Sequence, residues 1–99
     1  MRLSITIETL NDRVDLVLDD ESNKAQCNGK KLNCDITELK LNILALIRMW
    51  PEKLVNTNIV DGIKYKVIYK NGQTKKTYIG INKLPYNFEK FHTLIKNVQ

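Results

Sequence analysis

The chain has 99 residues, of which 42% are hydrophobic and 27% charged, a composition typical of one globular domain and unlike that of a disordered segment. Its formal charge is +5, and eleven of its sixteen basic residues lie in 40–99, so this part of the chain is expected to attract an anionic partner. No apolar run approaches the ~20 residues of a membrane span, and the alternating N-terminus lacks the apolar core of a signal peptide. We therefore expect a single cytoplasmic domain over residues 1–99 without a membrane partner.

Two hairpins are predicted in the N-terminal third. Apolar and polar residues alternate on both sides of a polar turn at Asn11-Asp12, the period-two pattern of half-buried strands. The inward residues of this first hairpin are Leu3, Ile5, Ile7, Val14, Leu16 and Leu18. A second, shorter hairpin is predicted around Asn28-Gly29, because both of these residues tolerate positive φ. Its strands are 25–27 and 30–33.

A helix is predicted from Ile36 to Trp50, where Pro51 disfavours continuation. Asp35 and Glu38 have the spacing of a capping box at its start. The core-facing stripe at helical spacing is Ile36, Leu39, Ile43, Leu46, Ile47 and Trp50.

Further apolar residues lie elsewhere on the same helix, and they are Leu41, Leu44, Ala45 and Met49. One explanation is that the C-terminal helix or residues 51–62 cover them. The other is an exposed patch that docks a partner or a second copy of the chain, with a homodimer forming through Leu41, Leu44 and Met49.

Residues 51–62 are irregular, with a possible tight hairpin at 59–63, and residues 63–81 then form the most informative predicted hairpin. A two-residue turn at Asn71-Gly72 would set Val67 beside Lys76, and burying a lysine is costly. We therefore predict a three-residue loop with Gly72 in the left-handed conformation. This register places Thr77, Ile79 and Ile81 on the inner face with Ile63, Tyr65 and Val67. The outer face then carries Lys64, Lys66, Lys70, Lys76 and Tyr78, with Lys75 near the tip.

A second helix is predicted after Asn87, which is expected to cap it. Its apolar stripe is Phe88, Phe91, Leu94, Ile95 and Val98, with His92 at the margin. The fold class is therefore α+β: an antiparallel sheet from two or three hairpins with two helices packed on one face, in the order ββ(ββ)αββα.

The residues capable of catalysis or metal binding form no recognisable site. His92 has no partner at a spacing that suggests a catalytic triad. The acidic cluster Asp15, Asp19, Asp20 and Glu21 lacks the glycine and ligand spacing of a calcium loop. Cys27 and Cys34 match no zinc motif and are too few for a disulfide framework, so we expect reduced thiols. We predict no enzyme, no cofactor and no metal.

The outer face of the 63–81 hairpin is the predicted contact surface. Its residues are Lys64, Lys66, Ile68, Lys70, Lys75, Lys76 and Tyr78. Such a face is commonly a solvated surface, and edge lysines also block unwanted strand pairing. As a binding face it suits either nucleic acid, with lysines on phosphates and Tyr78 stacking on bases, or an acidic protein anchored by Ile68, Tyr69 and Tyr78. The scarcity of arginine and the absence of paired RNA-binding aromatics favour the protein partner.

The abundance of Lys, Asn and Ile, together 35 of 99 residues, is typical of an A/T-rich genome. Small α+β chains of this kind are common among accessory proteins of phages and mobile elements. The leading hypothesis is therefore a small protein-binding or inhibitor module of anti-defence type. The alternative is a non-specific nucleic-acid-binding protein that uses the same hairpin.

Overall fold

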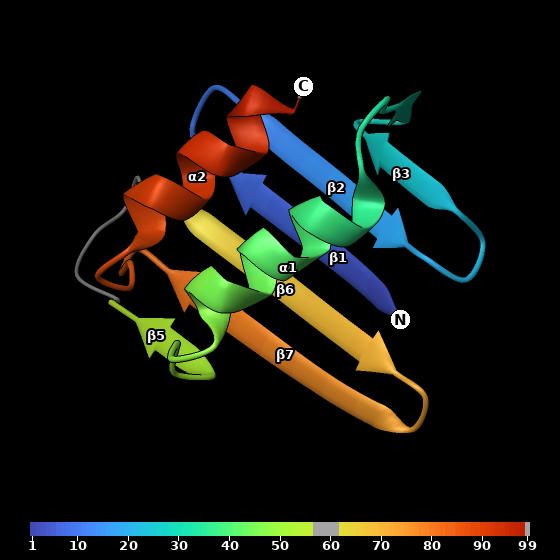
Figure 1. The fold of residues 1–99 in the computed structure, drawn as a ribbon. Coiled ribbons are helices and arrows are strands. Elements are labelled where there is room, and N and C mark those ends of the chain that lie inside the picture. The colour runs from blue at the N-terminus through green and yellow to red at the C-terminus, as the bar shows by residue number, and fades with distance from the viewer. Residues whose placement is uncertain (57–61, 99) are drawn as a thin grey trace.

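The protein folds as a seven-stranded sheet with two helices on one of its faces (Figure 1). The structure is a computed structural model, and it describes residues 1–56 and 62–98. The strands are β1 (Arg2–Glu8), β2 (Arg13–Asp19), β3 (Lys24–Cys27), β4 (Lys30–Lys31), β5 (Lys53–Val55), β6 (Lys64–Asn71) and β7 (Thr74–Ile81). The helices are α1 (Ile36–Ile47) and α2 (Phe88–Asn97). The strand order is β4-β3-β2-β1-β6-β7-β5, which confirms the predicted α+β class with both helices on one side of a mostly antiparallel sheet. Only the pairing of β5 with β7 is parallel among the described strands.

The two N-terminal hairpins form as predicted. Ile5 pairs with Leu16 in the β1–β2 ladder, and the inward residues of both strands are buried. In the β3–β4 turn, Asn28 and Gly29 have φ angles of 52° and 79°, the left-handed values that the Asn-Gly pair accommodates. The predicted hairpin at 59–63 falls largely on 57–61, which lie outside the described residues.

Helix α1 begins as predicted and ends earlier. The Asp35 carboxylate accepts a hydrogen bond from the Glu38 N–H at 3.1 Å, which satisfies one of the free donors of the first turn. The helix ends at Ile47, and the Trp50 N–H donates to the Ile47 carbonyl at 2.9 Å in a turn that still buries the indole ring.

Strand β5 follows Pro51 and was not predicted. It pairs in parallel with the C-terminal end of β7, where the Ile79 N–H donates to the Glu52 carbonyl at 2.8 Å. A three-residue strand offers too few residues for a period-two pattern, so its formation depends on the edge that β7 presents.

The predicted register of the 63–81 hairpin is wrong. Asn71 pairs with Thr74 around a two-residue turn, Gly72-Gln73, in which Gly72 takes a φ of 61°. A glycine with positive φ at the first central position is what a type II′ turn requires. The prediction considered a two-residue turn only one position earlier, at Asn71-Gly72.

The observed register avoids the cost that the prediction was meant to avoid. Val67 lies opposite Tyr78, and Lys76 lies opposite Tyr69 near the end of the sheet, where its ammonium stays exposed. Tyr65 lies opposite Gly80, which leaves room for the tyrosine ring. The inner residues of β7 are therefore Tyr78 and Gly80, not Thr77, Ile79 and Ile81.

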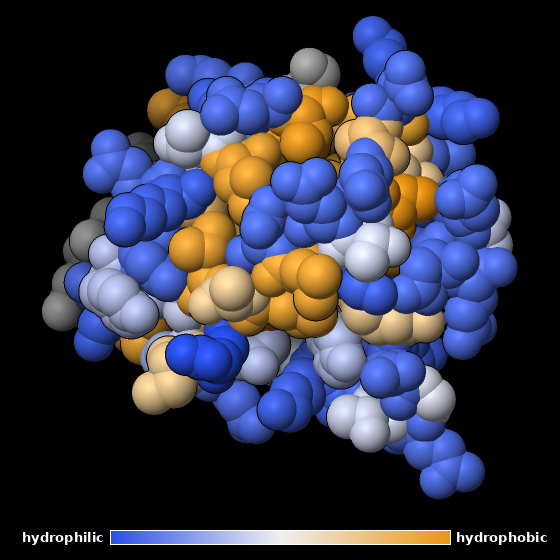
Figure 2. All heavy atoms as spheres, in the orientation of Figure 1, coloured by the Kyte–Doolittle hydropathy of each residue, from blue (hydrophilic) through white to orange (hydrophobic). Residues whose placement is uncertain are grey.

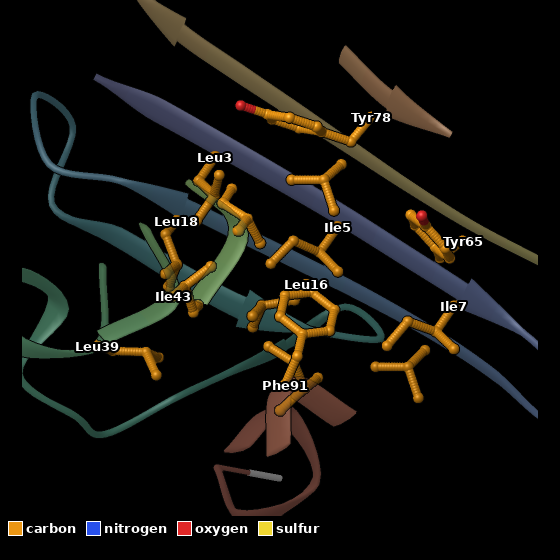
Figure 3. Packing of buried hydrophobic residues seen from close by; sticks show 14 of the residues in the cluster. Leu3, Ile5, Ile7, Leu16, Leu18, Leu39, Ile43, Tyr65, Tyr78 and Phe91 are labelled. Carbon is orange, nitrogen blue, oxygen red and sulfur yellow. The ribbon is translucent and has the colours of Figure 1, made fainter. Parts of the chain in front are cut away.

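The core lies between the sheet and the two helices (Figure 3). Leu3, Ile5 and Leu16 from the sheet meet Ile43 of α1 and Phe91 of α2, and each of these five is at most 1% exposed. This layer fixes which side of the sheet remains uncovered.

Asn87 was predicted to cap α2, and this prediction is wrong. Its side-chain oxygen accepts a hydrogen bond from the Trp50 indole N–H at 2.5 Å, and its amide nitrogen donates to the Leu46 carbonyl at 2.7 Å. Both partners lie at the end of α1, so Asn87 ties the start of one helix to the end of the other. The Trp50 ring in turn packs edge-on against Phe91 and Tyr65, with centroid distances of 4.8 and 5.2 Å.

Candidate functional site

The face of the β6–β7 ribbon that points away from the helices is the candidate site, and we call it the open face. Side chains alternate along each strand, so the inner residues Tyr65, Val67 and Tyr78 contact the helices and their neighbours point outward. The residues of the open face are Lys64, Lys66, Ile68 and Lys70 from β6, and Lys75, Thr77, Ile79 and Ile81 from β7.

Five of the seven predicted site residues lie together on the open face, and two do not. The five are Lys64, Lys66, Ile68, Lys70 and Lys75. Lys76 and Tyr78 lie on the helix side of the sheet, because a two-residue turn at Gly72-Gln73 replaces the predicted three-residue loop and shifts the register of β7 by one residue. Tyr78 is only 7% exposed and packs edge-on against Trp50, so it is not the outward stacking platform that the sequence suggested.

Three open-face residues were missed by the prediction: Thr77, Ile79 and Ile81. Each is half-buried and faces a residue of β6, in the pairs Ile68↔Thr77, Lys66↔Ile79 and Lys64↔Ile81. The apolar stems of the lysines therefore run beside isoleucine side chains while the ammonium groups reach solvent. A two-residue turn placed at Gly72-Gln73 would have predicted these three residues on the open face.

One end of the open face is strongly cationic. In the sheet, Lys70 has Arg2 of β1 on one side and Lys75 of β7 on the other. These three cations line a hollow of about 250 Å³ together with Ser4 and Ile68. In residues 1–56 and 62–98, none of the three cations forms an ion pair with a carboxylate.

The other end of the open face is more neutral. Glu8 of β1 lies opposite Lys64, and Arg13 of β2 is held by Asp15 at 3.0 Å and by Glu8 at 3.8 Å. The positive potential is therefore concentrated on β6, β7 and the start of β1.

A second hollow lies on the helix side, between α1 and the β6–β7 ribbon. It has a volume of about 400 Å³ and is lined by Leu41, Leu44, Ala45, Ile47, Arg48, Tyr69, Lys76 and Tyr78. Leu41 and Met49 are 58% and 72% exposed, so neither α2 nor the described part of 51–62 covers them. Leu44 is half-buried at the wall of the hollow.

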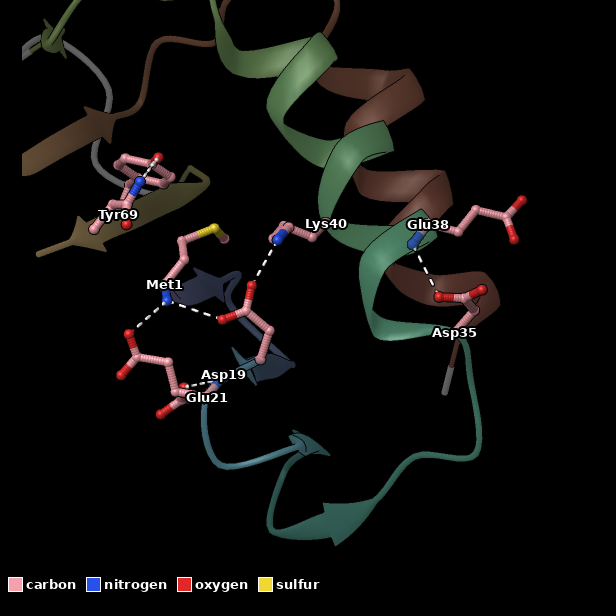
Figure 4. A network of polar contacts seen from close by, with 9 residues as sticks. Met1, Asp19, Glu21, Asp35, Glu38, Lys40 and Tyr69 are labelled. Carbon is pink, nitrogen blue, oxygen red and sulfur yellow. Dashed lines mark hydrogen bonds and ion pairs between the residues drawn. The ribbon is translucent and has the colours of Figure 1, made fainter.

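Within the acidic cluster, Asp20 forms ion pairs with two neighbouring cations (Figure 4). The Asp20 carboxylate accepts hydrogen bonds from the Lys40 ammonium at 2.6 Å and from the N-terminal ammonium of Met1 at 2.9 Å. These contacts, led by Lys40, lower the pKa of Asp20 to about 2. In the described part of the chain, no group of three or more His, Cys, Asp or Glu residues is arranged to hold a metal ion.

The groups capable of nucleophilic or acid–base chemistry are poorly activated. Burial raises the pKa of the Cys27 and Cys34 thiols, which disfavours the reactive thiolate. Burial, followed by the charge of Lys96, lowers the pKa of His92, so this side chain is neutral at pH 7. His92 packs against the Phe88 ring at 5.6 Å, which suits a boundary residue of the core.

Comparisons with models of protein families, with curated proteins and with solved structures find no match to this chain. Across the described residues, neither helix is long and apolar enough to cross a membrane.

Proposed function

We propose that this chain is a small non-enzymatic module that binds an acidic protein surface through the open face. The observation that carries the proposal is the mixture of residues there: half-buried Ile68, Ile79 and Ile81 form a central apolar strip bordered by four lysines. Neither helix covers this strip, because both pack on the opposite side (Figure 1). An apolar centre with a charged border is the arrangement of a protein-binding surface, in which burial supplies affinity and the lysines steer association.

The size of the face is sufficient for a stable complex. The molecule measures 41 × 29 × 19 Å, so it is flat, and the sheet occupies one of its broad sides. A standard protein–protein interface buries about 800 Å² on each partner, which this side can supply. The β6–β7 half alone would supply the apolar contact, with Arg2 and Ser4 of β1 extending it.

A nucleic-acid partner is less well supported. Single-stranded nucleic acid is usually held by stacking of bases on aromatic rings in addition to phosphate contacts. The outward residues of β6 and β7 include no aromatic ring, since Tyr65, Tyr69 and Tyr78 all lie on the other side of the sheet. The isoleucines that replace them suit an apolar protein contact better than a base.

We further propose that the module is a cytoplasmic accessory protein of a phage or mobile element that occupies a host protein, such as a component of host defence. Two features support this: the A/T-type residue usage, and a compact domain whose reactive groups are poorly activated. Inhibition by occupation requires only a binding surface, which is what the open face offers.

The test is retention of a partner from a nuclease-treated lysate of a low-GC bacterium on the immobilised protein. The wild type is compared with a Lys64→Glu/Lys66→Glu variant and with a Lys90→Glu/Lys96→Glu control, which changes the net charge equally at exposed sites of α2, on the opposite side of the sheet. We expect an acidic protein to be retained by the wild type and the control and lost by the open-face variant.

Two results would contradict the proposal. One is retention that is equal in all three proteins. The other is retention that disappears with nuclease treatment, with binding to an oligonucleotide that weakens log-linearly as salt rises, since that dependence is typical of phosphate contacts.

A further inference from the structure

Part of one edge of the sheet is left unpaired by the short strand β5. β5 pairs only with Ile79–Ile81 of β7, and the β7 residues that bond to it through the backbone are Ile79 and Ile81. Backbone groups alternate in direction along a strand, so the N–H and C=O groups of Lys75 and Thr77 also point to this side. None of the described strands pairs with them there.

The apolar hollow lies along this same stretch of β7, on the helix side. The β7 residues that line it are Lys76 and Tyr78, the inward neighbours of Lys75 and Thr77. Its apolar wall comes from Leu41 and Leu44 of α1, and Figure 2 shows apolar side chains at the surface between α1 and the β6–β7 ribbon. A strand added to β7 would direct every second side chain toward the helices, and therefore into this hollow.

The charged side chains of the unpaired stretch and of the hollow are all positive, while Glu52 lies beyond this stretch, where its carbonyl accepts a hydrogen bond from the Ile79 N–H. Lys75 lies on the open-face side, Lys76 lies on the helix side, and Arg48 stands at the rim of the hollow. The hollow is lined by no carboxylate. Acidic residues on an incoming strand would meet cations on both of its sides.

A second copy of this chain fits the edge poorly. Antiparallel pairing of two β7 edges would bring Lys75 and Lys76 of each copy beside the same lysines of the other, and like charges across a strand pair are destabilising. The edge therefore selects a partner whose strand is acidic.

We propose that the free edge of β7 at Lys75–Thr77 accepts an extended acidic segment of a partner protein as an added strand, with one apolar side chain of that segment in the hollow between α1 and β7. The main-chain groups of Lys75 and Thr77 supply the hydrogen bonds, and the hollow supplies selectivity for an apolar residue. The edge shares Lys75 and Thr77 with the open face, but it binds through their main-chain groups and through the hollow on the helix side. Variants of Lys64 and Lys66 therefore separate it from the function proposed above.

The test uses a displayed library of random short peptides, selected on the wild-type protein and depleted of binders to a Thr77→Pro variant. Proline removes the N–H that points to the free edge and leaves the bonds to β6 in place, as is tolerated on edge strands. Thr77→Val is the matched control, since it keeps the N–H and loses only the hydroxyl. Circular dichroism and thermal melts confirm that both variants fold.

We expect the selected peptides to carry an apolar residue with Asp or Glu one or two positions away. Their affinity should fall about tenfold in Thr77→Pro and stay within about twofold in Thr77→Val, in line with the loss of one well-formed hydrogen bond. Leu41→Asp, which places a negative charge at the hollow, should also weaken them. Bound peptide should slow hydrogen exchange at the amides of Lys75 and Thr77.

Three results would overturn the proposal. The first is that no peptide dependent on Thr77 is selected. The second is that the selected peptides protect other amides from exchange and leave Lys75 and Thr77 unprotected. The third is that the free protein is a dimer that Thr77→Pro dissociates, because a second copy would then be the occupant. Since Lys64→Glu/Lys66→Glu leaves this edge unchanged, failure here and failure of the open-face proposal are distinguishable.

Discussion

Replacing Gly80 with alanine tests the register on which the open face depends. In the observed register Gly80 faces the helices opposite Tyr65, and a Cβ atom at position 80 would overlap the Cε2, Cζ and Cδ2 atoms of that ring. In the three-residue-loop register, Gly80 would instead face solvent beside Lys64. The two registers therefore predict opposite effects of Gly80→Ala on stability.

The magnitude follows from how tightly the Tyr65 ring is held. Tyr65 is 2% exposed and lies against Trp50 and Phe88 at centroid distances of 5.2 and 5.4 Å, so the ring cannot swing away without disturbing the core. Overpacking of this kind costs about 3 kcal/mol at the upper end of its usual range. Replacing a strand glycine with alanine returns about 0.5–1 kcal/mol, which leaves a net loss of about 2 kcal/mol. For a domain of this size the melting temperature should fall by about 8–16 °C.

The assay is thermal and urea unfolding followed by circular dichroism. In a Tyr65→Leu background, which removes the ring, the same Gly80→Ala change should cost little, and the difference between the two backgrounds measures the contact directly. If Gly80→Ala instead raised the melting temperature by a few degrees, position 80 would face solvent, and the assignment of lysines and isoleucines to the open face would be refuted.

Three further predictions follow from single contacts. Tyr65→Phe should leave the free energy of unfolding unchanged or raise it by up to about 1 kcal/mol, because the buried hydroxyl has no hydrogen-bond partner in the described structure. A clear decrease of the free energy of unfolding, measured by urea denaturation, would contradict this and show that the hydroxyl has a partner. Asn87→Ala should cost about 1–3 kcal/mol because it leaves the Trp50 N–H without its acceptor, and Asn87→Asp should recover part of that loss; equal stability of wild type and Asn87→Ala would contradict the link between the helices. Because the folded-state pKa of Asp20, about 2, lies below its ordinary value of 3.8, the stability it contributes is present above about pH 4 and is lost as pH falls toward 2. Asp20→Asn should therefore flatten the dependence of unfolding free energy on pH between 4 and 2, and an unchanged slope would contradict the contact with Lys40.

Much of the fold could be predicted because local signals and burial agree. The alternation around Leu3 and Leu16, the Asn28-Gly29 turn and the Asp35 cap each act within a few residues, and the structure has all three. The amphipathic stripe of α2 is equally local, with Phe88, Phe91 and Ile95 buried.

The failures over β5 and Asn87 involve partners distant in sequence, whereas the register error comes from the turn of the hairpin itself. The prediction placed Lys76 on the outer face because a lysine on the inner face was expected to be buried. Lys76 in fact lies on the inner face near the end of the sheet and stays exposed. β5 forms because it can pair with Ile79–Ile81 of β7, and no pattern in residues 51–56 indicates that pairing. Asn87 resembles a cap in sequence, and only the packing of Trp50 against α2 gives it another role.

The candidate site was predicted only in part, because the predicted register was correct for β6 and wrong for β7. The even-numbered residues of β6 face outward in either register, so Lys64, Lys66, Ile68 and Lys70 were placed correctly. The residues of β7 change sides with a shift of one position, so Tyr78 was replaced on the open face by Thr77, Ile79 and Ile81. The aromatic residue predicted on this face is therefore replaced by aliphatic ones, which supports the proposed protein partner over nucleic acid.

Lysine footprinting of the complex tests the proposed function most directly. The protein is treated with an acetylating reagent, free and in the presence of the retained partner, and acetylation of each exposed lysine is measured by mass spectrometry. We predict protection of Lys64, Lys66, Lys70 and Lys75 on the open face, with Lys90 and Lys96 of α2 reacting as in the free protein. Protection of the second group with full reactivity of the first would contradict binding through the open face.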